Sequence, residues 1–174
     1  MTELLDVVDM NDNFLKGEDR KIVHNSYQWH RGVHILLINS KNEILLQIRS
    51  PTKDKFPNCY DCSVSEHVKI GESFENAAKR GIKEELGLEN IVLKKLVKLR
   101  MNYGPHDNMI TEVFEISFDG KVKLDKNETS KIIFVPKQDI PKLLEKENGR
   151  FPTWTREILR WYLGMSSKIE ELDK

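Results

Sequence analysis

Five charged side chains with the chemistry of a catalytic or metal site gather in one short segment, residues 65–88. Four are carboxylates and one is a guanidinium: Glu66, Glu72, Arg80, Glu84 and Glu85. Carboxylate oxygens are the hard ligands that Mg²⁺ prefers, and an arginine beside them holds acids in fixed orientations. The segment therefore predicts a divalent-cation site or, as the alternative, a solvated set of ion pairs.

A helix is expected to position the last three of these groups. Ser73 is a good N-terminal cap, and Gly87 suits the helix end because glycine tolerates the left-handed conformation found there. At about 100° per residue, Glu85 falls on the apolar side of this helix and Glu84 on its border. A carboxylate that faces a core is costly unless it is paired or binds a metal. The alternative is an amphipathic helix in which Glu84 pairs with Arg80 and Glu85 reaches solvent.

The spacing of these residues resembles the Nudix box, the loop–helix motif of the Nudix hydrolases. The positions in register are Glu72, Arg80, Ile82, Glu84, Glu85, Gly87 and Leu88. Two positions depart from the motif. Glu66 stands where the motif begins with glycine, and Gly81 stands where it has a glutamate after the arginine.

The resemblance implies a fold and an activity. The fold is α/β, a Nudix α/β/α sandwich with a mixed central sheet. The activity is water attack on phosphorus in a nucleoside diphosphate-X or related organic diphosphate, with Mg²⁺ or Mn²⁺ as cofactor. The resemblance makes Glu72, Glu84, Glu85 and Glu112 the metal ligands. It makes Glu85, Glu112 and Arg80 catalytic residues, with Arg80 as an orienter of carboxylates, and the hypothesis given next adds Glu66 to them.

Gly81 raises a difficulty, because some Nudix proteins use the glutamate at that position as base or metal ligand. We hypothesise that Glu66 reaches into the space above Gly81 and restores the missing charge. The alternative is that both departures signal lost or altered activity, as in a non-catalytic domain that binds a nucleotide.

A second resemblance is to isopentenyl-diphosphate isomerase, itself a protein of this fold. His30 and His67 match metal-binding histidines of that enzyme, but Ser65 stands in place of its cysteine. Ile110 and Glu112 are matched to its two acids, so one acid is missing. We therefore favour a hydrolase and keep an isomerase-like enzyme as the alternative.

Substrate contacts are expected from Arg49, Lys53 and His67, with a small-molecule diphosphate as the partner. The neighbouring histidines His24, His30 and His34 are interpreted as structural residues, with substrate contact as the rival. The resemblance allows a homodimer, which nothing in the sequence fixes.

The chain is expected to form one domain over residues 1–174. Within it, residues 1–29 form an N-terminal hairpin extension, with strands at 3–8 and 21–24, and residues 66–88 form the box. A further hairpin is expected at 32–39 and 44–49, because both runs are apolar and a polar turn separates them. The later apolar runs, 91–103, 110–118 and 132–135, are expected to be strands, and 138–146 and 153–170 helices.

Composition excludes several classes of protein. The 28 basic and 28 acidic residues balance, so no nucleic-acid polymer is expected as partner. No apolar run approaches the roughly 20 residues that span a bilayer, so no membrane is expected either. Cys59 and Cys62 have no second pair to complete a zinc site. A cytoplasmic protein is expected.

Overall fold

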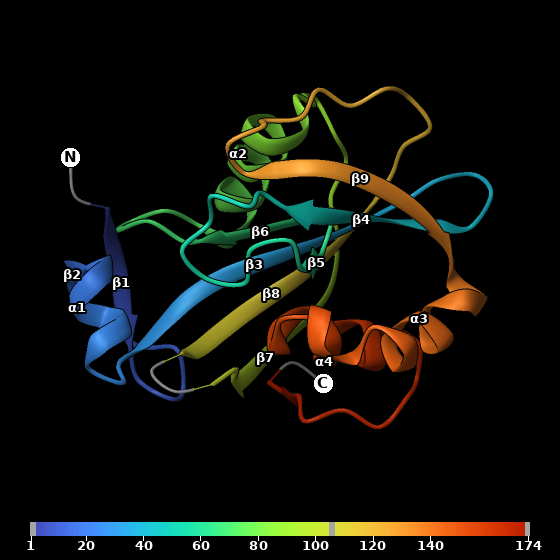
Figure 1. Ribbon diagram of the computed structural model, residues 1–174. Coiled ribbons are helices and arrows are strands. Elements are labelled where there is room, and N and C mark those ends of the chain that lie inside the picture. Colours follow the sequence, from blue (N-terminus) through green and yellow to red (C-terminus); the bar gives the residue numbers. More distant parts are fainter. Residues whose placement is uncertain (1–2, 105–106, 173–174) are drawn as a thin grey trace.

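The structure, a computed structural model, describes residues 3–104 and 107–172. A mixed β-sheet crosses the molecule, with helices on both of its faces (Figure 1). The strands are β1 (Leu4–Val8), β2 (Phe14–Asp19), β3 (Trp29–Ile38), β4 (Glu43–Arg49), β5 (Tyr60–Asp61), β6 (Val64–His67), β7 (Lys94–Asn102), β8 (Asn108–Ser117), β9 (Thr129–Pro136) and β10 (Glu170–Glu171). The α-helices are α1 (Arg20–Asn25), α2 (Phe74–Leu86), α3 (Ile140–Lys146) and α4 (Thr153–Tyr162).

Strand β3 is the centre of the sheet. It runs parallel to β8 over its whole length, and on its other side it pairs in turn with β1, β6 and β4, all antiparallel. The sheet therefore forks on that side of β3, because three strands share one edge. The fork brings the N-terminal hairpin, β6 and β4 around one region, where the site described below is found.

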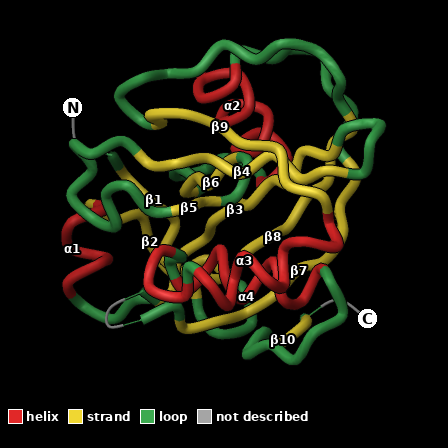
Figure 2. The backbone as a smooth tube through the Cα atoms, turned by 45° about the vertical axis from the view of Figure 1, so that its right-hand side comes forward, coloured by secondary structure: helices red, strands yellow, loops and turns green. Residues whose placement is uncertain are grey.

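Two apolar layers hold the helices to the sheet. Helix α2 packs on one face through Ala77, Ala78 and Ile82, and α4 packs on the other face through Ile158 and Leu159. Each fully buried Ile or Leu side chain contributes about 1.5–3 kcal/mol. Figure 2 shows α2 on one side of the strands and α3 with α4 on the other. The predicted α/β/α sandwich with a mixed sheet is confirmed.

Helix α2 begins and ends where the sequence predicts. The Ser73 hydroxyl accepts a hydrogen bond from the Asn76 amide, and Gly87 adopts the left-handed conformation at φ 66°. Small side chains on its inner face let the helix lie close to β6. A Cβ atom at Gly81 would come within 2.7 Å of Glu66 Cγ and 2.8 Å of Val64 Cγ1. Gly81 is therefore required for this close approach.

The N-terminal hairpin consists of β1 and β2, with α1 following directly. The prediction of a strand at 21–24 was wrong, because these residues lie in α1. Asp19 caps this helix by accepting from the Lys21 amide, and Val23 packs against the apolar face of β1. One apolar contact thus suffices to anchor a short helix whose sequence also suits a strand. At the other end, α4 stops at Tyr162 rather than at 170, and Gly164 follows at φ 69°.

None of the helices in the described part of the chain is long and apolar enough to cross a membrane.

Candidate functional site

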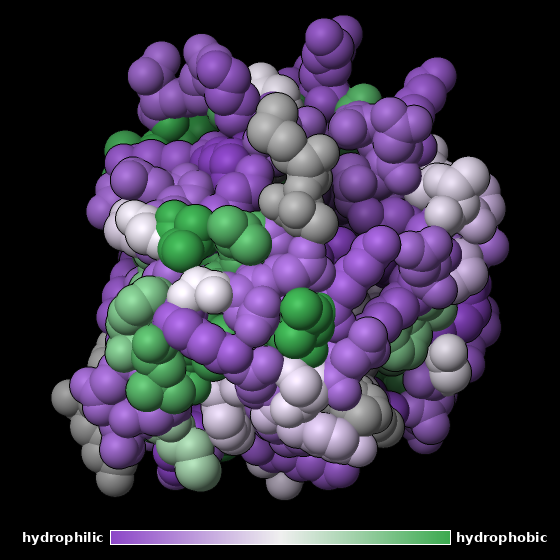
Figure 3. Space-filling model, turned by 90° about the vertical axis from the view of Figure 1, so that its left-hand side faces the viewer, coloured by the Kyte–Doolittle hydropathy of each residue, from purple (hydrophilic) through white to green (hydrophobic). Residues whose placement is uncertain are grey.

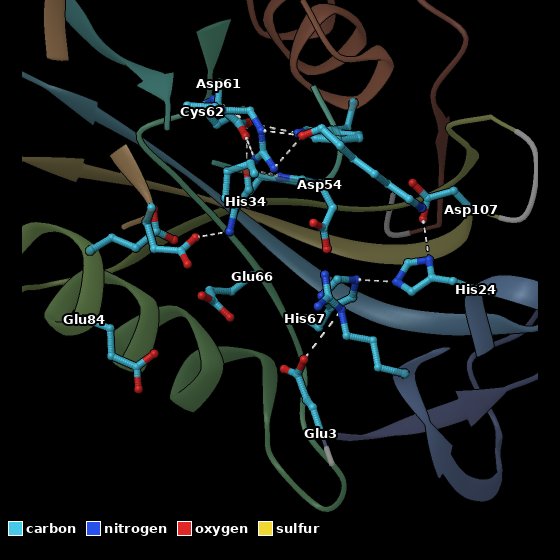
Figure 4. A pocket seen from close by; sticks show the side chains of 18 of the residues that line it. Glu3, His24, His34, Asp54, Asp61, Cys62, Glu66, His67, Glu84 and Asp107 are labelled. Atoms are coloured by element: carbon cyan, nitrogen blue, oxygen red, sulfur yellow. Dashed lines mark hydrogen bonds and ion pairs between the residues drawn. The ribbon is translucent and has the colours of Figure 1, made fainter. Parts of the chain in front are cut away.

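One cavity of about 780 Å³ lies at the fork of the sheet. Its walls carry acids, cations and histidines together (Figure 4). The acids include Glu66, Glu84, Glu85, Asp61 and Asp107. The cations include Arg20, Lys21, Arg49, Lys53, Lys55, Lys69 and Arg80. A cavity with both signs of charge fits an anionic ligand and a cation that it shares with the protein.

Glu85 is the buried acid of this cavity. It is 6% exposed, and one of its oxygens accepts a hydrogen bond of 2.7 Å from Gln47 Nε2. Burial raises the pKa of Glu85 well above its ordinary value, and the charge of Glu66 raises it further. The inward direction that the helix pattern predicts for Glu85 is confirmed. An acid in this setting favours either a proton or a bound cation.

Glu66 lies over Gly81, since a Cβ atom at position 81 would come within 2.7 Å of Glu66 Cγ. Its Oε2 pairs with Arg80 Nη1 at 3.0 Å. Burial raises the pKa of Glu66, although Arg80 opposes that shift. In Figure 4, Glu66 lies between Glu84 of α2 and His67. Glu84 is more exposed than Glu66 and Glu85. Its side chain is 54% exposed, and its Oε2 is 3.4 Å from Arg80 Nη1.

Arg80 holds the acids of the box in place. Its Nε and Nη2 donate to Glu72 at 3.0 and 3.1 Å, and Nη2 also donates to the carbonyl of His67 at 2.8 Å. Glu72 further accepts from the Lys69 amide at 3.1 Å and does not line the cavity. The structure thus places Glu72 as a partner of Arg80, away from the space where a ligand would bind.

Glu112 is not brought to the other predicted site residues. It pairs with Lys95 at 2.9 Å, and it does not line the cavity. Alternation along β8 explains this position. Met109 and Thr111 share the face of His30, whereas Ile110 and Glu112 point to the opposite face, towards α2.

The predicted phosphate contacts do lie at the cavity. Arg49 donates to Asp61 at 2.7 Å, and Lys53 pairs with Glu128. Asp61 is fully buried and also accepts from Trp154 Nε1 at 2.9 Å and from Thr155 Oγ1 at 2.7 Å. Burial by itself raises the pKa of Asp61, but Arg49 and these donors outweigh it and lower the pKa. A fixed carboxylate therefore holds Arg49 at the cavity wall.

Three histidines and an acid form a second cluster at the hairpin side of the cavity. The ligand atoms of His24, His30 and His67 all lie within 4.8 Å of one another. Asp107 Oδ1 is 3.8 Å from His24 Nδ1 and 3.8 Å from His30 Nε2. His30 Nε2 and Asp107 Oδ1 are buried, and neither has a hydrogen-bond partner among the described residues.

Burial keeps the imidazoles of His30 and His67 neutral. It lowers the pKa of His30 to about 3 and that of His67 well below its ordinary value, and nearby His24 and His30 add to each effect. Burial also raises the pKa of Asp107 to about 6. Neutral imidazole nitrogens and a carboxylate directed at one point are the donor set of a transition-metal site.

Ser65 also lines the cavity. Its hydroxyl donates to Asp61 Oδ1 at 3.0 Å and is 3.0 Å from His34 Nδ1. Burial lowers the pKa of His34 to about 4, so this ring is also neutral. The hydroxyl that replaces a thiol in the isomerase comparison is thus fixed by two buried partners.

Sequence reasoning found this cluster only in part. The isomerase resemblance pointed to His30 and His67 as metal-binding histidines, but His24 was interpreted as a structural residue, although its closeness to His30 in the sequence was a signal of a cluster. Asp107 had no signal of its own, because only the pairing of β8 with β3 brings it to the histidines.

Comparisons with known proteins agree on one family. Residues 28–162 match the family model of the NUDIX domain. The chain is 31% identical over 157 residues to a prenyl-diphosphate phosphatase of Methanosarcina mazei, a match that covers 88% of this chain and 91% of that protein. It is 30% identical over 169 residues to isopentenyl-diphosphate Delta-isomerase 1 of Mus musculus, with 84% and 74% covered. Among solved structures, DR0079 of Deinococcus radiodurans has a TM-score of 0.80 at 24% identity, with 91% and 98% covered, and it shares the fold.

Proposed function

Since the chain belongs to the NUDIX family, we propose that it hydrolyses an organic diphosphate with divalent cations held by its own carboxylates. The observation that carries the proposal is a cavity lined both by the acids of α2 and β6 and by the cations of α1 and of residues 49–55. A diphosphate bound with a metal ion requires both the cationic and the carboxylate side chains of the cavity. Arg49, Lys53 and neighbouring cations bind its free oxygens, and the carboxylates hold the cation that it shares with the protein.

Glu84 and Glu85 are the proposed metal ligands. The raised pKa of Glu85 reflects a buried charge with one donor, Gln47, and a bound cation is the remaining source of compensation. A divalent cation at this point supplies charge neutralisation for the diphosphate and an activated water. Mg²⁺ and Mn²⁺ both suit oxygen ligands.

Glu66 is the proposed base. Its Oε2 is held by Arg80, which leaves Oε1 to accept a proton from the attacking water. The raised pKa of Glu66 brings it nearer to the neutral range in which a general base is effective. Glu72 acts through Arg80 as a positioning residue, and Glu112 is not assigned a role in the site.

The histidine cluster is proposed to hold a further divalent cation of the kind that imidazole prefers, such as Zn²⁺, Co²⁺ or Fe²⁺. The buried His30 Nε2 and Asp107 Oδ1, which lack hydrogen-bond partners among the described residues, support this assignment. The role of His67 is therefore proposed to be metal binding through its ring, while its carbonyl holds Arg80.

The proposed substrate class is a prenyl or similar organic diphosphate, because the relative in Methanosarcina mazei is a prenyl-diphosphate phosphatase. The test is phosphate and diphosphate release from isopentenyl diphosphate, geranyl diphosphate and ADP-ribose after metal stripping and reloading with Mg²⁺ or Mn²⁺. We expect turnover of a prenyl diphosphate that depends on the metal. Ligand binding without release from any substrate would replace the hydrolase with a binding domain.

An isomerase-like activity is the second candidate, favoured by the histidine cluster alone. Formation of dimethylallyl diphosphate from isopentenyl diphosphate, followed by NMR in the same reactions, decides between the two. We expect none, because Ser65 is a far weaker proton donor than a thiol. The cytoplasmic location expected from the sequence stays a prediction.

A further inference from the structure

Exposed hydrophobic side chains are concentrated on the N-terminal hairpin and on the segment beside it. Figure 3 faces this side of the molecule, and hydrophobic spots lie there among hydrophilic ones. Elsewhere in the described chain, the exposed large hydrophobic residues are Phe56, Val92 and Phe134. Such a concentration at one end of a molecule indicates an interaction surface. Its members are Leu4, Met10, Phe14, Leu15, Ile22, Tyr27 and Ile70.

Strand β2 forms the outer edge of the sheet at this end. The Arg20 amide donates to the Glu3 carbonyl. Because hydrogen-bonded pairs alternate along an antiparallel ladder, the backbone N–H and C=O groups of Lys16 and Glu18 point towards β1. The N–H and C=O groups of Gly17 therefore point to the open side. An exposed edge of this kind is a template for another strand.

We propose that two copies of this chain associate by antiparallel pairing of their β2 strands about a two-fold axis at Gly17. In this register Gly17 and the partner's Gly17 exchange N–H to C=O hydrogen bonds. Lys16 then lies opposite the partner's Glu18, and Glu18 lies opposite the partner's Lys16. Each strand thus supplies the opposite charge that the other requires, which is the self-complementarity of a two-fold interface.

Glycine at the axis also brings hydrophobic side chains together. The Ile70 side chain lies over Gly17, where its Cδ1 occupies the space that a Cβ atom would need. Two Ile70 side chains therefore meet above the paired glycines, with Leu15 of each strand beside them. Ile70 and Leu15 are 47% and 60% exposed in the single chain, and the pairing covers both.

The β-bulge of the hairpin limits the ladder. Between Val7 and Val8 the register with β1 shifts by one residue, which leaves Leu15 as the extra residue of β2. A bulge twists a strand away from further pairing, so the ladder is centred on Gly17 rather than on Phe14. At the other end of the ladder, the Asp19 amide donates to Glu18 Oε1 at 3.1 Å, so it does not donate to a partner strand.

Sedimentation velocity over a range of concentrations tests the proposal on the full chain. We expect a monomer–dimer equilibrium, with Lys16→Glu and Glu18→Lys each raising the dissociation constant about tenfold, because like charges then face each other twice. An equal mixture of the two variants should restore association, since each variant supplies the charge that the other needs. The ion pair between Lys16 and Glu18 within one strand stays broken in that mixture, so its loss does not explain a recovery.

Circular dichroism of each single variant serves as the folding control. Deuterium uptake at the Gly17 amide should slow as the concentration of wild-type protein rises. A wild-type chain that stays monomeric, or a dimer that the two single variants do not weaken, overturns the proposal. A mixture that associates no better than its components also overturns it.

Discussion

The carboxylate centre, Glu66, Glu84 and Glu85, and the histidine centre, His24, His30, His67 and Asp107, line the same cavity but are built in different ways. The carboxylate centre comes from one continuous segment, whose helix and preceding strand are cross-linked by Arg80. The histidine centre comes from three segments that only the pairing around β3 brings together. One centre offers hard oxygen ligands and the other mainly neutral imidazoles, so the two suit different cations.

The largest expected effect is on the rate of hydrolysis, and it distinguishes Glu85, which lines the cavity, from Glu112, which does not. Glu85→Gln should lower the rate of diphosphate hydrolysis about 10³-fold, because it removes a charged ligand from a buried site. Glu112→Gln is the matched control, and its rate should stay within about twofold, since Glu112 pairs with Lys95 away from the cavity. If steady-state assays show equal losses of hydrolysis rate in both variants, Glu112 also acts in the site.

A smaller effect should separate the two centres. His67→Ala should abolish the visible absorption of bound Co²⁺ at the histidine centre and lower hydrolysis about 10- to 100-fold. The backbone carbonyl of His67 still accepts from Arg80 in this variant, so the box stays in place. Glu85→Gln should leave the Co²⁺ spectrum unchanged. A Co²⁺ spectrum that responds to Glu85→Gln and not to His67→Ala would reverse the assignment.

The two centres also differ in how far the sequence predicted them. The order of Arg80, Glu84 and Glu85 along one helix sufficed to predict which acid faces inward, since helix geometry fixes which side chains share a face. The departure at Gly81 pointed correctly to Glu66, and the structure places Glu66 over it.

The sequence pointed to His30 and His67 of the histidine centre through the isomerase resemblance, but His24 and Asp107 lay beyond this reasoning because their positions depend on how the strands pair around β3. A shift of one residue turns every side chain of a strand to the other face. Asp107 shows this limit, since only the pairing of β8 with β3 places it beside His30. The prediction of a strand at 21–24 was wrong for a related reason. These residues suit either a strand or a short helix, and the packing of Val23 on β1 favours the helix.

The basic wall should affect binding more than turnover. Arg49→Lys should raise KM about tenfold with little change in kcat, because lysine loses the planar pair of donors that spans Asp61 and a phosphate. Arg156→Lys on the exposed side of α4 is the control, and its KM should be unchanged. A selective fall in kcat would show instead that Arg49 acts in the transition state.

The smallest effect concerns stability without metal. Burial raises the pKa of Glu85, so its ionised form destabilises the fold once the pH exceeds the unfolded pKa of about 4.5, and fully so above the raised folded pKa. Glu85→Gln removes this cost. Its melting temperature in a chelator at pH 8 should therefore exceed that of the wild type by about 3 °C, from roughly 1 kcal/mol. Calorimetry should show the difference shrinking as the pH falls towards 4, and a constant difference would contradict this origin.

The replacement of Gly81's missing carboxylate by Glu66 is tested most directly by the metal-dependent hydrolysis rate of three variants. Glu66→Ala should lose about 100-fold in rate. Adding Gly81→Glu to this variant should recover part of that loss when Val64→Ala is included. Val64→Ala is needed because a Cβ atom at position 81 would otherwise come within 2.8 Å of Val64 Cγ1. The variant Val64→Ala alone controls for packing and should keep nearly full activity. Full activity in Glu66→Ala would contradict the assignment of Glu66 as the base.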